Sequence, residues 1–176
     1  MAVLKPQDLA VVLYLCKPAS PRPPYAQIAA ALFMSPSEVH GAVARAVASG
    51  LLHGTELGHR PNLSAVEEFL LHGVKYAFPS ERGEPSRGVP TSYAAAPLSA
   101  FIAPGDDLPP VWPYPTGKLR GTALQPLYRG APQAALSDPL LYEYLALVDA
   151  LRDGRARERK LAAELITSRL RPGVHA

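Results

Sequence analysis

Residues 24–52 read PYAQIAAALFMSPSEVHGAVARAVASGLL, and we expect the rest of the chain to be arranged around this stretch. Its pattern predicts two short helices joined by a tight turn, the second of which carries a complete set of start signals. Ser35 can cap that helix through its hydroxyl, and Pro36 suits the first helical position because no N–H is needed there. Glu38 completes a Ser-x-x-Glu capping box by reaching back to the cap. The sequence therefore predicts that the second helix begins at Ser35.

Both predicted helices have one apolar side, which each is expected to bury. The apolar residues at helical spacing are Ile28, Ala29 and Leu32 in the first helix, and Val39, Ala42, Val43, Ala46 and Val47 in the second. The opposite side of the second helix is small or polar and consists of Ser37, His40, Gly41, Ala44, Arg45 and Ala48. Gly50 is expected to end this helix. A slim helix with such a face can approach another surface closely.

After the second helix, the residues LLHGTELGHRPN (51–62) predict two short extended pieces around a turn from Gly54 to Gly58. Arg60 would lie on this hairpin, with His53 and His59 beside it. An arginine in such a place can enter the minor groove of DNA or contact a phosphate. The alternative is an ordinary hairpin with exposed polar tips.

The pattern resembles the helix-turn-helix of winged-helix transcription regulators, particularly those of the MarR type. In this resemblance SPSEVHGAVARAVASGLL matches the recognition helix and the strand that follows. It covers the first third to half of the chain and implies a mainly α fold with small β elements. It implies that Ser37, His40, Gly41 and Arg45 face DNA. Together with Ser35 and Arg60, these are the residues that we expect to bind DNA. One position departs from the family, which often has an arginine where this chain has Gly41.

The resemblance implies a sequence-specific regulator of transcription that binds double-stranded DNA, most simply as a homodimeric repressor. One alternative is a small helical hairpin whose polar face is merely solvated. Another is a protein-interaction module, such as the antitoxin of a toxin–antitoxin pair, which could also repress its own operon. In that case the partner would be a toxin protein.

The chain is expected to have three parts. Residues 1–78 would form the winged helix-turn-helix, including a first helix from Lys5 to Cys16 and a later helix capped by Ser64. Residues 79–137 would form an irregular but ordered segment, because 11 of the 20 prolines lie between 79 and 132. Within it, residues 112–124 predict a β-hairpin that turns at Pro115 to Lys118.

Residues 138–176 would form a C-terminal helical hairpin, opened by Asp138 and Pro139 and interrupted at Gly154. Its apolar stripes are Leu141, Tyr144, Leu145, Val148 and Leu151, then Leu161, Leu165, Ile166 and Leu170. We expect these helices to mediate dimerisation. The competing account is that they fold back on the proline-rich segment and cover Trp112, leaving a monomer.

Composition excludes several classes of protein. The chain has 18 basic and 15 acidic residues, a net charge of +3, whereas a general polyanion binder would be more basic. Cys16 is the sole cysteine, which suits a reducing compartment, and we expect a cytoplasmic protein. No apolar run is long enough to span a bilayer, so no membrane partner is expected.

Nothing in the sequence indicates catalysis. The histidines show no metal-ligand spacing such as His-x-x-x-His, and no Ser, His and Asp form a recognisable catalytic motif. The segment around Gly117 and Lys118 lacks the earlier glycine and the following Ser or Thr of a phosphate-binding loop. The prediction is a non-enzyme without a metal or cofactor.

Overall fold

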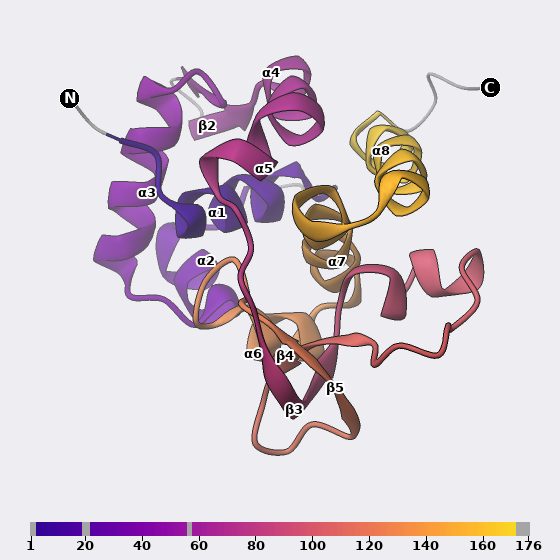
Figure 1. The fold of residues 1–176 in the computed structure, drawn as a ribbon. Helices are drawn as coiled ribbons and strands as arrows, with labels where there is room; N and C mark the ends of the chain where they lie inside the picture. Colours follow the sequence, from indigo (N-terminus) through magenta and orange to yellow (C-terminus); the bar gives the residue numbers. More distant parts are fainter. Residues whose placement is uncertain (1–2, 19–21, 56–57, 172–176) are drawn as a thin grey trace.

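The computed structural model describes residues 3–18, 22–55 and 58–171 of a chain of mixed α and β structure (Figure 1). Its first part holds three helices, α1 (Pro6–Cys16), α2 (Tyr25–Leu32) and α3 (Pro36–Ala48). They are followed by an antiparallel pair, β1 (Leu52–Thr55) and β2 (Gly58–Pro61), in which His53 lies opposite Arg60. Residues 56 and 57 at the tip of the expected turn lie outside the described residues.

The predicted start of α3 is confirmed. The Ser35 hydroxyl accepts a hydrogen bond from the Glu38 N–H at 3.2 Å, and the Glu38 carboxylate accepts one from the Ser35 N–H at 2.7 Å. Phe33, which ends α2, adopts a left-handed conformation with φ of 54° and turns the chain toward α3. The inward stripes are buried as expected, except that Val47 is only half-buried.

The next helical segment runs from α4 (Leu63–Glu68) through a π-helical turn, η1 (Phe69–Gly73), to α5 (Val74–Ala77). Asn62 caps α4, because its side-chain oxygen accepts a hydrogen bond from the Ala65 N–H at 3.3 Å. The expectation that Ser64 caps this helix is therefore wrong. Ser64 lies inside the first turn instead.

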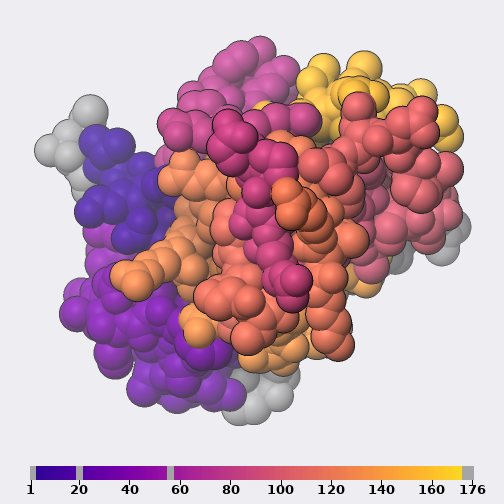
Figure 2. Space-filling model, turned by 60° about the horizontal axis from the view of Figure 1, so that its bottom comes forward, coloured from indigo at the N-terminus to yellow at the C-terminus, as the bar shows by residue number. Residues whose placement is uncertain are grey.

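Three strands of the proline-rich segment pair with one another: β3 (Arg82–Pro90), β4 (Pro110–Pro113) and β5 (Leu119–Leu124). The expected hairpin between β4 and β5 is wrong. β5 pairs antiparallel with the first part of β3, and β4 pairs antiparallel with its last part. β4 and β5 therefore run parallel to each other. Figure 2 shows β3 and β5 together on one face of the molecule. Two short 3₁₀ turns, η2 (Ser92–Ala94) and η3 (Leu98–Ala100), join β3 to β4.

Glycines permit this close crossing of strands. A Cβ added at Gly88 would lie 2.0 Å from the carbonyl oxygen of Trp112, and one added at Gly121 would lie 2.0 Å from that of Pro109. Both distances are far below van der Waals contact, so only glycine lets these backbones approach one another here.

The C-terminal part contains α6 (Ala131–Ser137), α7 (Pro139–Asp153) and α8 (Ala156–Leu170). Asp138 caps α7 as predicted, since its carboxylate accepts a hydrogen bond from the Leu141 N–H at 3.0 Å. Helix α7 lies in the middle of the molecule and packs against α1, α5, α6 and α8 (Figure 1). One cluster of buried apolar side chains includes members of α1, α3, β3 and α7. The expected boundaries at 78 and 138 therefore do not separate independent cores.

The buried side chain of Asp149 joins α7 to the proline-rich segment. Its Oδ2 accepts hydrogen bonds from the Thr91 hydroxyl and the Trp112 indole N–H, both at 2.7 Å. Its Oδ1 accepts one from Arg152 Nη1 at 2.7 Å. Burial raises the pKa of Asp149, while Arg152 and the hydrogen bonds oppose that rise. Trp112, which donates to this carboxylate, is only 1% exposed.

This packing corrects the expected role of the α7 stripe. Leu141, Leu145, Val148 and Leu151 are each at most 5% exposed within a single chain. They therefore cannot contact a second copy while this fold persists. The competing expectation, that the C-terminal helices fold back and cover Trp112, describes the observed packing.

Candidate nucleic-acid interface

The outward side of α3 is exposed over much of its length. Ser37, His40 and Ala44 are exposed, and Gly41 is partly covered. Because these side chains are small or polar, the helix presents a narrow surface that another molecule can approach closely. This is the face that the sequence pattern assigns to solvent.

The first turn of α3 is already occupied by its own cap. The Ser35 hydroxyl contacts both Ser37 Oγ at 3.1 Å and Glu38 Oε2 at 2.7 Å. Hydrogen bonds from the Ser35 N–H and hydroxyl lower the pKa of Glu38, which favours its ionised form. A phosphate would meet this negative charge, so the helix start is a poor phosphate site. Any contact with DNA here would use the hydroxyl of Ser37.

Arg45 is held by an intramolecular ion pair. Its Nε and Nη2 each donate to a carboxylate oxygen of Asp8 on α1 at 2.7 Å. The Asp8 side chain is fully buried and that of Arg45 is 20% exposed. Arg45 therefore does not extend freely from α3, and its contact with DNA stays a prediction. A buried aspartate needs this partner, because an unpaired charge inside a protein is costly.

The ion pair of Arg45 with Asp8 also limits the space available for a side chain at Gly41. A Cβ added at Gly41 would lie 3.1 Å from Arg45 Nη1, which is tighter than an ordinary contact. The guanidinium of Arg45 thus occupies the space above Gly41 on its way to Asp8. A side chain larger than glycine at position 41 would require the Arg45 guanidinium to shift slightly.

Tyr25 connects α3 to the β1–β2 hairpin. Its hydroxyl is 3.0 Å from Nδ1 of His59 on β2, and its ring makes an edge contact with His40 on α3, with centroids 5.9 Å apart. Sequence reasoning did not assign a role to Tyr25. The available signal was an aromatic residue at a helix start where winged helices more often have a capping Ser or Thr.

Arg60 is exposed on β2, next to His59. Burial lowers the pKa of Arg22, and the charge of Arg60 lowers it further, so these two arginines lie near each other. Of the residues expected to bind DNA, His40 lies beside the β1–β2 hairpin through the contacts of Tyr25 with His40 and His59. Arg60 follows His59 on β2, where consecutive side chains point to opposite faces of the strand. Ser35 and Ser37 lie at the start of α3, while Arg45 is directed toward α1.

The described residues contain neither a metal-ligand cluster nor a membrane-spanning helix. Over 3–18, 22–55 and 58–171, no group of three or more His, Cys, Asp or Glu side chains could hold a metal ion. None of the helices in those ranges is both long and apolar enough to cross a bilayer. Burial raises the pKa of the Cys16 thiol to about 12, which disfavours the reactive thiolate. Comparisons of the chain with protein-family models, curated proteins and solved structures found no match.

Proposed function

We propose that the chain is a sequence-specific regulator of transcription, most simply a repressor, that binds double-stranded DNA through α3 and the β1–β2 hairpin. The observation that carries this proposal is the contact of Tyr25 with both His40 and His59. These contacts hold the exposed, narrow face of α3 beside the β1–β2 hairpin, which carries the cation Arg60. The order of three helices followed by a two-stranded hairpin supports the proposal, because winged-helix proteins share it.

Each element would have its own part in binding. The outward side of α3 would enter the major groove, where the His40 imidazole and the Ser37 hydroxyl can form hydrogen bonds with base edges. Arg60 would contact a phosphate or the minor groove. Since Arg45 is paired with Asp8, few cations remain for phosphates, and we expect modest, salt-sensitive affinity.

Replacing Arg60 by alanine tests this assignment. The variant should bind the duplex upstream of the protein's own gene more weakly, and the slope of log affinity against log salt should fall by about 0.9, the loss of one phosphate contact. Fluorescence anisotropy over a series of salt concentrations measures both quantities. Arg120→Ala is the matched control, because Arg120 is equally an exposed strand arginine but lies on β5.

Equal weakening by Arg60→Ala and Arg120→Ala would mean that only overall charge matters. An unchanged salt slope in the Arg60 variant would remove the hairpin from the interface. Circular dichroism should show both variants folded, since neither side chain is buried.

Homodimerisation stays a prediction, and its interface must lie outside the buried stripe of α7. The toxin-binding alternative also stays a prediction. The large exposed apolar side chains among the described residues include Phe33, Leu63, Phe101 and Leu136. Exposed apolar residues are normal on protein surfaces, so their exposure alone does not indicate a protein-binding patch.

A further inference from the structure

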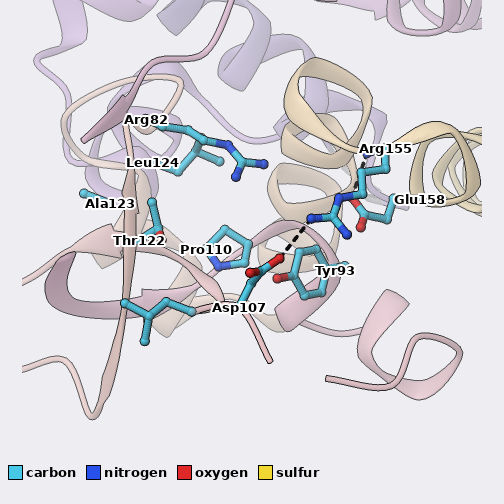
Figure 3. Close-up of a pocket in the computed structure, with 10 residues that line it drawn as sticks. Arg82, Tyr93, Asp107, Pro110, Thr122, Ala123, Leu124, Arg155 and Glu158 are labelled. Carbon is cyan, nitrogen blue, oxygen red and sulfur yellow. Dashed lines mark hydrogen bonds and ion pairs between the residues drawn. The ribbon is translucent and has the colours of Figure 1, made fainter. Parts of the chain in front are cut away.

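A pocket of about 340 Å³ lies between the β3–β5 sheet and the turn that joins α7 to α8 (Figure 3). This volume is within the range of small-molecule sites. One wall is largely apolar and is formed by Leu108, Pro110, Ala123 and Leu124. The charged and polar residues of the lining are Arg82, Arg155, Asp107, Glu158, Tyr93 and Thr122. None of these residues belongs to the surface that we assign to DNA.

Two arginines from different elements line the pocket and keep unused donors. Arg82 on β3 donates to Asp153 through Nε and Nη2, the shorter contact being 2.7 Å, which leaves Nη1. Arg155, just before α8, donates from Nη2 to Asp107 at 3.0 Å, which leaves Nε and Nη1. Figure 3 shows the two guanidinium groups directed toward the pocket from opposite sides. Together they can bind one carboxylate.

A buried carboxylate faces the same pocket. Glu158 is 8% exposed, and its Oε2 accepts a hydrogen bond from the Arg155 N–H at 2.8 Å. Within the described residues it forms no ion pair, and its Oε1 has no hydrogen-bond donor. A buried carboxylate is stabilised by a cation. The charge of Arg82 already acts on Glu158 without forming an ion pair, and Oε1 of Glu158 is left to accept a hydrogen bond from a positive group in the pocket.

Tyr93 lies among these charges. Burial raises the pKa of its hydroxyl, Glu158 and Asp107 add to the rise, and Arg155 and Arg82 oppose it. The hydroxyl thus interacts electrostatically with both arginines and both carboxylates. Its oxygen has no hydrogen-bond partner within 3–18, 22–55 and 58–171, so it remains available to a bound molecule.

Among the lining residues, Arg82 and Arg155 oppose Asp107 and Glu158, while Asp153 outside the lining is paired with Arg82. A simple anion would meet the two carboxylates, and a simple cation would meet the two guanidinium groups. A molecule with one charge of each sign adds no net charge to the pocket. The exposed pair of Arg155 and Asp107, whose side chains are 77% and 76% exposed, is weak enough to rearrange around such a molecule.

We propose that this pocket binds a small zwitterion, specifically an α-amino acid with an apolar side chain. Its carboxylate bridges Arg82 and Arg155, and its ammonium group lies at Glu158 with the Tyr93 hydroxyl nearby. Its side chain packs against Leu108, Pro110 and Leu124. The site is independent of the proposed DNA-binding function.

Isothermal titration calorimetry of the full chain with each common L-amino acid tests the proposal. We expect saturable one-to-one binding of L-leucine or another aliphatic member of the set. Two analogues of leucine each lack one charge: 4-methylpentanoate has no ammonium group and 3-methylbutylamine has no carboxylate. Each should bind at least about tenfold more weakly, because each loses one set of charge-assisted hydrogen bonds, to buried Glu158 or to the two arginines. Failure of every amino acid to saturate the protein below about 10 mM would overturn the proposal, and so would equal binding of the analogues.

Variants locate the binding in this pocket. Arg155→Gln should weaken amino-acid binding by about tenfold through loss of a charged hydrogen bond. Tyr93→Phe, which removes only the hydroxyl, should weaken it by a smaller factor. Arg157→Gln is the matched control, because Arg157 is exposed on the first turn of α8 and does not line the pocket. Binding that Arg155→Gln leaves unchanged, or that Arg157→Gln weakens equally, would place the amino acid elsewhere and contradict the inference.

Discussion

Replacing Asp149 by alanine should lower the free energy of unfolding by about 3–5 kcal/mol, the range for breaking a buried ion pair. Asp149 is 1% exposed, and the Arg152 side chain paired with it is 4% exposed. The substitution leaves the Arg152 charge without its partner and removes the acceptor for the Thr91 hydroxyl and the Trp112 N–H. Urea denaturation followed by circular dichroism and by the fluorescence of the sole tryptophan measures the loss.

Two variants on the same helix serve as controls. Asp149→Asn retains a side-chain oxygen acceptor and should cost less than alanine. Asp153→Ala breaks an ion pair with Arg82, whose side chain is 54% exposed, and should cost no more than about 1 kcal/mol. If Asp149→Ala were no more destabilising than Asp153→Ala, Asp149 would not join α7 to the sheet segment as described.

Replacing Arg45 by alanine should also destabilise the fold, by about 3 kcal/mol, the lower end of the same range, because Arg45 is 20% exposed. The change leaves the fully buried Asp8 carboxylate without its cation. Chemical denaturation of Arg45→Ala, Asp8→Ala and the double variant measures the coupling. The double variant should lose clearly less stability than the sum of the two single losses.

The opposite outcome would be an Arg45→Ala variant that keeps its stability but binds DNA more weakly. Arg45 would then contact DNA, as its position on α3 first indicated, and the pair with Asp8 would contribute little. Arg60→Ala provides the comparison, because loss of this exposed arginine should reduce DNA affinity without lowering stability.

The helices were largely predictable because their signals are local. Ser35, Pro36 and Glu38 specify the start of α3 within four consecutive positions, and Asp138 with Pro139 does the same for α7. The hydrogen bonds that form these caps join residues three apart, so sequence spacing is sufficient to recognise them. Helix α6 was not predicted, because its seven residues lie within a proline-rich context and are too few to show a clear helical period.

The sheet was not predictable in the same way, because its pairing is non-local. β4 and β5 were recognised approximately as extended pieces, but each pairs with β3, which precedes them by many residues. A short turn between two strands favours an antiparallel hairpin from sequence alone. Both strands pair antiparallel with β3 and also pair directly with each other, so they run parallel.

The candidate interface was predicted in outline but not in its internal contacts. Helical spacing placed Arg45 on the outward side, but Asp8, which pairs with it, lies 37 residues earlier. Trp112 and Asp149 are likewise 37 residues apart. Spacing reports which side of a helix a residue occupies, but it does not report which distant side chain that residue will contact.

The most direct test of the proposed function is titration of the intact chain against the duplex upstream of its own gene. Scrambled duplexes of equal length and composition serve as competitors, and His40→Ala is the matched loss of a base-contacting group. We expect the upstream duplex to bind at least about 10³-fold more tightly than scrambled DNA, and His40→Ala to reduce that ratio. Equal binding of the two kinds of duplex, or no binding at low salt, would contradict the account of α3 and the β1–β2 hairpin as a sequence-reading surface.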